Sequence, residues 1–267
     1  MRKTLVPASL AMFASAVLFA LAADVPPTPQ AQFNQNLNSI ARVDLDRRAS
    51  ALAQIQTRAQ AEHRESQVRA TVLRLIGGLP DRPGPLNAKF LGALPEQSFH
   101  VERLTYDSLP DFHVTANLYL PDQGSAPHPA VIYTPGHNPA GKLEAWLFGA
   151  NMASNGIAVL AYDPIGEGER LQYFDPATNE SLAGHPTGEH SEASVQVMLT
   201  GDHIARYFVW DAMRGIDYLE TRSDIDPQRI GALAARAVEL SPPILPRSIL
   251  GSKPPASRVT SPPSTIY

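Results

Sequence analysis

The chain has 267 residues, no cysteine, 22 Lys and Arg against 26 Asp and Glu, and 25 prolines. With 43% hydrophobic and 18% charged residues it can bury a sizeable core, which excludes a wholly disordered protein. The lack of cysteine excludes a disulfide-stapled mini-protein and a cysteine-ligated metal site. A net charge of −4 offers no basic excess for nucleic acid or anionic lipid, so an enzyme or a binding module for small neutral ligands fits better.

Residues 1–22 have the pattern of an export signal. Arg2 and Lys3 provide a basic start, and an apolar stretch from Leu5 to Leu21 ends in small residues at Ala22. The alternative is a membrane anchor, but this apolar stretch is short for a span and is interrupted by Pro7. We therefore expect cleavage after Ala22 and an exported protein, periplasmic or secreted, without a stable membrane span.

The next two segments are expected to be a tether and a helical region. Residues 23–38 are rich in Pro, Gln and Asn without periodicity, which predicts a flexible tether. Within the helical segment 39–98, apolar residues recur among charged ones and predict one long helix over about 40–76. The basic positions of that helix invite a nucleic-acid interpretation, but the acidic overall balance favours a solvated face.

Strand patterns begin at residue 99. Residues 101–106 and 112–120 alternate between apolar and polar positions, with turn-forming residues at 108–111 between them. This pattern predicts an antiparallel hairpin with one buried face.

Two continuous apolar runs follow, at 130–133 and 157–162, as expected for parallel strands that are covered on both faces. Helices are predicted over 142–154 and about 201–221, and a third parallel strand is predicted to begin at Arg229. The alternation of strands and helices predicts a doubly wound α/β sheet with right-handed crossovers.

Open parallel sheets bind ligands at the carboxyl ends of their strands, so the turns after the two apolar runs are the candidate site. Gly136, His137 and Asn138 follow the first run, where free backbone N–H groups or polar side chains could stabilise an oxyanion.

Asp163, Gly166 and Gly168 follow the second run. Asp163 could be a ligand or a catalytic acid, but an aspartate at this position more often caps a loop through backbone N–H groups, so we assign the three residues structural roles.

The Pro-Gly-His turn at 135–137, the Tyr-Asp-Pro-Ile-Gly-Glu-Gly-Glu stretch at 162–169 and the Asp-Ile-Asp-Pro-Gln-Arg-Ile-Gly stretch at 224–231 resemble α/β-hydrolases. Exported acetyl xylan esterase-like and prolyl-oligopeptidase-like hydrolases are the most similar group. The resemblance implies the amino-terminal half of a hydrolase sheet over 99–234, preceded by a long helix. It also implies a serine ester hydrolase with an acyl-enzyme, no cofactor, and a small-molecule or polysaccharide acyl ester as substrate, such as acetylated plant polysaccharide.

The sequence departs from that family after Gly231. The family continues into Gly-x-Ser-x-Gly, which is missing here, and no Asp or Glu follows Glu239. Residues 235–267 are rich in proline and are expected to be a disordered tail. Ser241 cannot be the nucleophile because two prolines follow it. We therefore expect nucleophile, acid and histidine to be missing and the chain to be inactive.

A frameshift would explain this departure. Shifting the reading register over 236–250 allows codons for Ser-Gly-Gly-Gly-Thr-Gln-Ser-Ala-Tyr-Leu-Ala-Ala-Leu-Asp-Pro, and the two preceding codons can encode Gly-Cys. This peptide is a nucleophile turn followed by an apolar helix. The hypothesis is that the tail is a frameshift product.

The sequence also bears on three other functions. A metal site would have to use residues whose spacing matches no common ligand pattern, so helix-cap and loop roles are favoured: His185, Glu189, His190, Glu192, Asp202 and His203. Gly166-x-Gly168 is too short for a dinucleotide motif, so no nucleotide cofactor is expected. The remaining alternative is a non-catalytic exported module that binds a glycan or a protein.

Overall fold

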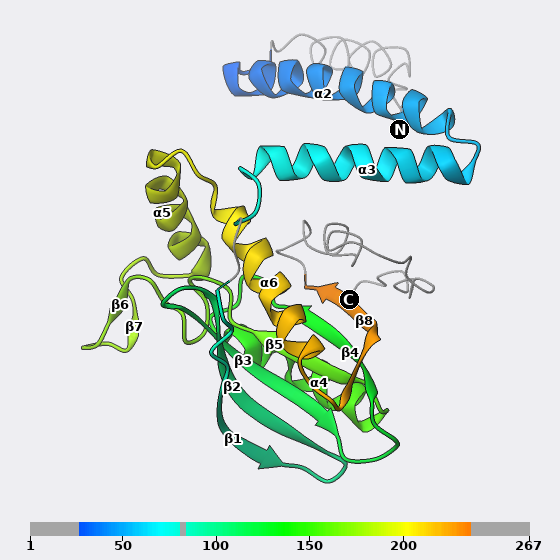
Figure 1. Cartoon of the computed structure of the whole chain (residues 1–267). Helices are drawn as coiled ribbons and strands as arrows, with labels where there is room; N and C mark the ends of the chain where they lie inside the picture. The colour runs from blue at the N-terminus through cyan, green and yellow to red at the C-terminus, as the bar shows by residue number, and fades with distance from the viewer. Residues whose placement is uncertain (1–26, 81–83, 236–267) are drawn as a thin grey trace, which may run out of the picture. The chain divides into compact units, whose positions relative to one another are not determined.

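The computed structural model describes residues 27–80 and 84–235 (Figure 1). The chain divides into two compact units at the Ser66–Gln67 bond. The expected signal peptide and all but the first residue of the expected tail lie outside the described residues.

Two helices precede the sheet, α2 (Pro29–Ala53) and α3 (Arg58–Leu75). Helix α2 begins inside the expected tether, which corrects that expectation from residue 29 onward. The Thr28 side chain accepts a hydrogen bond from the N–H of Ala31, and Pro29 occupies the first turn, where a missing N–H costs nothing. The single long helix is also corrected, because the chain turns at 54–57 between α2 and α3. Within residues 27–80 and 84–235, no helix combines the length and apolar character that crossing a membrane requires.

The core of the second unit is a six-stranded sheet in the order β1-β2-β3-β5-β4-β8. The strands are β1 (Lys89–Pro95), β2 (Phe99–Leu109), β3 (Phe112–Pro121), β4 (His128–Thr134), β5 (Ala158–Tyr162) and β8 (Ile225–Ala234). Strands β1, β2, β3 and β5 pair antiparallel in turn, whereas β4 pairs parallel with both β5 and β8. The predicted hairpin and the predicted parallel strands are confirmed.

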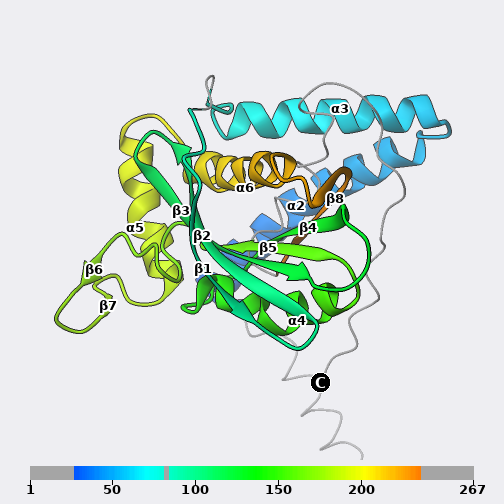
Figure 2. The same ribbon diagram turned by 60° about the horizontal axis from the view of Figure 1, so that its bottom comes forward.

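Helices cover both faces of this sheet (Figure 2). The 3₁₀ turn η1 (Gly141–Ala145) and helix α4 (Trp146–Ser154) follow β4, and Ala145 and Ala153 pack with the apolar side chains of one face. Helix α6 (Ile204–Glu220) packs against the other face in a larger apolar cluster. Two separate cores on opposite faces explain why β5 is buried along its whole length, as its unalternating sequence predicted.

The sequence did not predict β1 or the long connection between β5 and α6. That connection carries a two-stranded hairpin, β6 (Phe174–Asp175) and β7 (Glu180–Ser181), and helix α5 (Pro186–Leu199). It leaves the carboxyl end of β5, which is the edge where ligands bind in sheets of this kind.

Helix α6 lies closest to the sheet at Gly215. A Cβ atom at this position would lie 2.8 Å from Cδ1 of Ile132 and 2.9 Å from the hydroxyl oxygen of Tyr106. That hydroxyl is buried and donates a 3.0 Å hydrogen bond to the carbonyl oxygen of Asp211. Glycine is therefore required here by close packing, even though it weakens a helix.

Replacing Gly215 by Ala is expected to lower the free energy of unfolding by about 1–3 kcal/mol, because overpacking outweighs the gain in helix propensity. The matched control is Gly231→Ala, whose added Cβ would lie no closer than 3.9 Å to another group. Urea denaturation measures both variants, and equal stability of the two would contradict the close-packing argument.

Candidate functional site

The loops that follow β4 and β5 meet because the two strands are parallel neighbours. Asp163, the first residue after β5, is fully buried and joins three segments. Its carboxylate accepts hydrogen bonds from the hydroxyl of Thr115 on β3 and from the backbone N–H of Lys142 at 2.7 Å. The ammonium of Lys142 also binds it and is itself only 8% exposed. Asp163 thus fixes the two loops to each other and to the sheet.

Two glycines make room for this carboxylate. Gly141 and Gly168 have φ of +53° and +54°, and a Cβ on either would lie 2.1 Å from Oδ1 of Asp163. Gly166 has φ of +79°, and its Cβ would lie 2.7 Å from Cβ of Glu189 on α5. These contacts are of the kind expected from structural roles for Asp163, Gly166 and Gly168.

A second buried ion pair holds the β5 loop to α6. Arg170 lies 2.7 Å from the carboxylate of Asp211 and also donates a 2.9 Å hydrogen bond to the carbonyl oxygen of Asp163. Both side chains are almost fully buried. The loop from residue 163 to 170 is therefore anchored at both ends.

In the expected oxyanion turn, residues 136–138, two backbone N–H groups face acidic side chains. The N–H of Gly136 donates a 3.1 Å hydrogen bond to Oε2 of Glu144, and the N–H of Asn138 acts on the carboxyl group of Glu167. The side chain of Asn138 accepts a hydrogen bond from the N–H of Ala140, and His137 is exposed. Of the three N–H groups, only that of His137 is not directed at a carboxylate of the described residues.

Glu167 is the least satisfied polar residue of this site. It is fully buried, and neither carboxyl oxygen has a hydrogen-bond partner of good geometry among the described residues. Burial raises the pKa of Glu167 to about 8, and the charges of Glu144 and Asp163 act in the same direction, against the N–H of Asn138. At neutral pH the carboxyl group is therefore mostly protonated and uncharged.

His190 lies beside this acid and beside His137. Its Nε2 donates a 2.7 Å hydrogen bond to the carbonyl oxygen of Ile165, which leaves Nδ1 without a proton, and Nε2 lies 3.7 Å from Glu167. The rings of His137 and His190 are 4.8 Å apart. Burial lowers the pKa of His190, and the neighbouring His137 lowers it further. The site thus combines a neutral histidine with a neutral carboxylic acid.

The remaining histidines and acids of the β5–α6 connection have structural contacts. His185 and His203 cap the first turns of α5 and α6, which confirms the predicted capping roles. Glu189 is fully buried and accepts hydrogen bonds from the N–H groups of Gln172 and Tyr173 and from the hydroxyl of Ser181. In the part of the chain that the structure describes, no group of three or more His, Cys, Asp or Glu could hold a metal ion.

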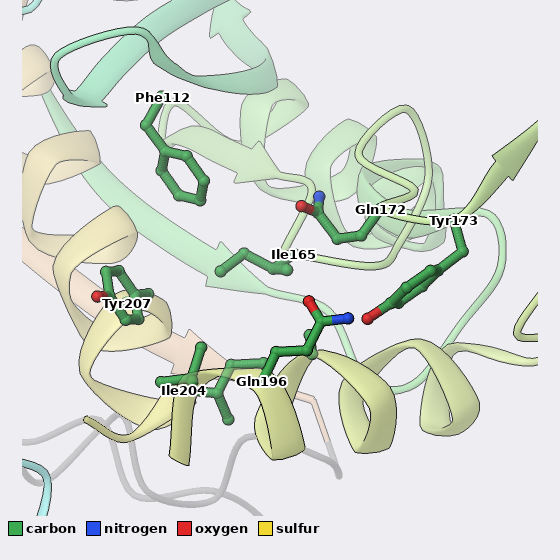
Figure 3. Close-up of a pocket in the computed structure, with 9 residues that line it drawn as sticks. Phe112, Ile165, Gln172, Tyr173, Gln196, Ile204 and Tyr207 are labelled. Carbon is green, nitrogen blue, oxygen red and sulfur yellow. The ribbon is translucent and has the colours of Figure 1, made fainter. Parts of the chain in front are cut away.

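A pocket of about 380 Å³ opens next to this site (Figure 3). Its lining comes from the start of β3, the loop after β5, helix α5 and the start of α6: Phe112, Ile165, Gln172, Tyr173, Ala193, Gln196, Val197, Ile204 and Tyr207. The carbonyl oxygen of Ile165, one of the lining residues, binds His190, so the pocket and the histidine pair share a neighbour. Sequence reasoning missed this pocket because its lining is scattered over segments that only the folded chain brings together.

Breaking the Asp163–Lys142 pair is expected to destabilise the second unit strongly. Asp163→Asn takes the buried counter-ion away from the ammonium of Lys142, which then keeps only the exposed carboxylate of Glu169, and the loss should be about 3 kcal/mol. The control is Asp122→Asn, which removes the negative charge beside His100 from a side chain that is 43% exposed and should cost less than about 1 kcal/mol. Chemical denaturation compares the two variants, and similar losses would refute the anchoring role of Asp163.

Glu167 should make stability depend on pH. The pKa of Glu167 is higher in the folded than in the unfolded chain. Its protonated form therefore contributes fully to the free energy of unfolding below the unfolded pKa of 4.5, and this contribution is lost as pH rises through about 8. Glu167→Gln removes this loss, so the variant should gain stability relative to the parent between pH 5 and pH 9. Urea unfolding at a series of pH values tests this, and a constant difference between the two proteins would contradict it.

Comparison with known proteins agrees with the topology. No protein-family profile matches the sequence. YtaP of Bacillus subtilis (strain 168), a provisionally assigned hydrolase, is 27% identical over 177 residues, which are 62% of this chain and 54% of YtaP. The chain thus spans about half the length of this curated relative.

Two solved structures have similar folds. A provisionally assigned acetyl xylan esterase from Bacteroides fragilis NCTC 9343 gives a TM-score of 0.54 at 16% identity, over 66% of this chain and 47% of its own. Methylesterase BT1017 gives a TM-score of 0.53 at 21% identity, over 70% of this chain and 38% of its own. The likeness covers about two thirds of this chain, and the chain has the α/β-hydrolase fold over these residues.

Proposed function

We propose that this fold belongs to a serine carboxylic ester hydrolase that acts on a small-molecule or polysaccharide acyl ester. The observation that carries the proposal is the meeting of the glycine-rich turn 136–138 with the anchored loop 163–170 at the carboxyl edge of the parallel strands. Strand β8 ends at the same edge, beside β4. In α/β-hydrolases the nucleophile turn follows such a strand, so a serine there would face the turn.

The turn supplies the oxyanion side of the reaction. Serine would attack the ester carbonyl and form an acyl-enzyme as the bond to the alcohol breaks and the alcohol leaves. Water would then hydrolyse the acyl-enzyme to the carboxylic acid and the free serine. The N–H of His137 is the best placed donor of the three, since those of Gly136 and Asn138 are directed at Glu144 and Glu167. The proton on Glu167 limits the negative charge beside this position, which favours an oxyanion.

We further propose that the chain as given does not complete the catalytic triad. The sequence after Gly231 contains no Gly-x-Ser-x-Gly, and those residues lie outside the described part of the structure. Export through residues 1–22 and a frameshifted tail at 235–267 belong to the same proposal. They rest on the sequence patterns alone.

The chain as given is expected to hydrolyse 4-nitrophenyl acetate no faster than buffer with the same amount of an inert protein. The absorbance of released nitrophenol measures this, before and after treatment with a serine-directed fluorophosphonate. Hydrolysis by the monomeric chain that this reagent blocks would overturn the proposed lack of activity.

The frame-restored protein is the positive arm of this test. Genomic DNA after the Gly231 codon should encode the nucleophile turn in another frame, and the protein made from that frame should hydrolyse the ester. Changing its new serine to alanine should abolish activity. Absence of the peptide from the DNA would end the frameshift hypothesis, and an inactive, folded frame-restored protein would end the esterase proposal.

A further inference from the structure

We infer that the pocket between α5 and the loop after β5 is a binding site for an uncharged aromatic ring that carries one hydrogen-bonding group. The chemistry of its lining points to such a ligand. None of the nine lining residues is charged, and three of them are aromatic: Phe112, Tyr173 and Tyr207. A pocket without charge binds a charged ligand poorly, because that ligand would lose its hydration without gaining a partner.

The floor of the pocket is apolar. Ile165 and Ile204 are buried, and the partly buried Ala193 and Val197 of α5 continue the same surface. A strongly hydroxylated ligand such as a sugar would leave most of its hydroxyl groups facing these side chains without partners. A flat ring buries its apolar faces there instead, so the floor favours an aromatic ligand.

The polar groups of the pocket are few and are grouped together. In Figure 3 the amide of Gln196 and the hydroxyl end of Tyr173 point toward one another across the pocket. Neither group forms a hydrogen bond with another described residue, whereas the hydroxyl of Tyr207 is already bound to Asp202. The amide nitrogen of Gln172 is bound to the carbonyl of Arg170, which leaves its oxygen as an acceptor. Few polar groups at one place fit a single substituent on the ring.

The walls of the pocket are held in place before any ligand binds. The carboxylate of Glu189 accepts hydrogen bonds from the N–H groups of Gln172 and Tyr173, and Asp202 holds the hydroxyl of Tyr207 at 2.9 Å. A pocket that is already formed loses little entropy when a rigid ligand enters.

The place of the pocket suggests which part of a substrate it takes. Ile165 lines the pocket, and its carbonyl oxygen binds His190, whose ring lies next to that of His137. A ring bound here would lie at the same sheet edge as the ester group proposed above. That the ring belongs to an ester, as in a phenolic acyl group, rests on the proposed function, whereas binding of the ring itself does not.

The test uses 4-ethylphenol, an uncharged ring with one hydroxyl group and no ester, titrated into the purified full chain and followed by ligand-observed NMR. We expect saturable binding, with 4-hydroxybenzoate and methyl β-xylopyranoside at least about tenfold weaker. No saturable binding, or tighter binding of the charged ring or of the sugar, would overturn the inference. Because no probe is an ester, the result does not depend on whether the frame-restored protein is active.

Two substitutions on α5 show whether the probe occupies this pocket. Ala193→Trp fills it and should weaken 4-ethylphenol about tenfold or more, whereas Val195→Trp, at a position that is 57% exposed and outside the lining, should leave binding unchanged. Gln196→Leu removes the amide that would bond the hydroxyl of the probe, at an exposed position where folding is perturbed little, so it should also weaken binding. This variant tests the inference if Ala193→Trp does not fold. Unchanged binding in the folded pocket variants would place the ligand elsewhere.

Discussion

The arrangement of the site depends on one buried carboxylate, that of Asp163. A charge in the interior must be neutralised and hydrogen-bonded, and Asp163 meets both conditions through Lys142 and Thr115. Each partner belongs to a different segment, so satisfying the charge also fixes the loops after β4 and β5 relative to β3. The two glycines beside the carboxylate follow from the same requirement, because any side chain there would collide with it. The candidate oxyanion turn is held in place by electrostatics as much as by packing.

A second consequence is that the groups next to the turn are uncharged at neutral pH. Glu167 retains its proton and His190 does not gain one, in both cases mainly because burial disfavours the charged form. A reaction that develops negative charge at the turn would meet less repulsion than if Glu167 were ionised. Glu144 differs, because its carboxylate already binds the N–H of Gly136, and an oxyanion would have to compete for that donor.

The connection between β5 and α6 adds a ligand-sized space to this edge of the sheet. Glu189 of α5 binds the hairpin and the residues before it through hydrogen bonds to its buried carboxylate. It connects separate segments in the same way as Asp163 does in the loops after β4 and β5. Gly166 joins the two systems, since its close approach to Glu189 brings the loop after β5 against α5. The pocket and the histidine pair both contact Ile165 and therefore share one framework.

The sequence alone determined the antiparallel hairpin, the parallel strands and the turn at 136–138, because apolar periodicity and turn residues are local properties of the chain. It also favoured loop or helix-cap roles for His185 and His203. It did not predict that Pro29 begins a helix, that the Glu144 carboxylate occupies the N–H of Gly136, or that Glu167 is left without a good hydrogen-bond partner. Strand β1, helix α5 and the pocket also emerged only from the tertiary structure. The physical reason is common to these features of the site: they depend on which distant groups share a buried environment, and pairing, pKa and cavity shape are properties of that environment.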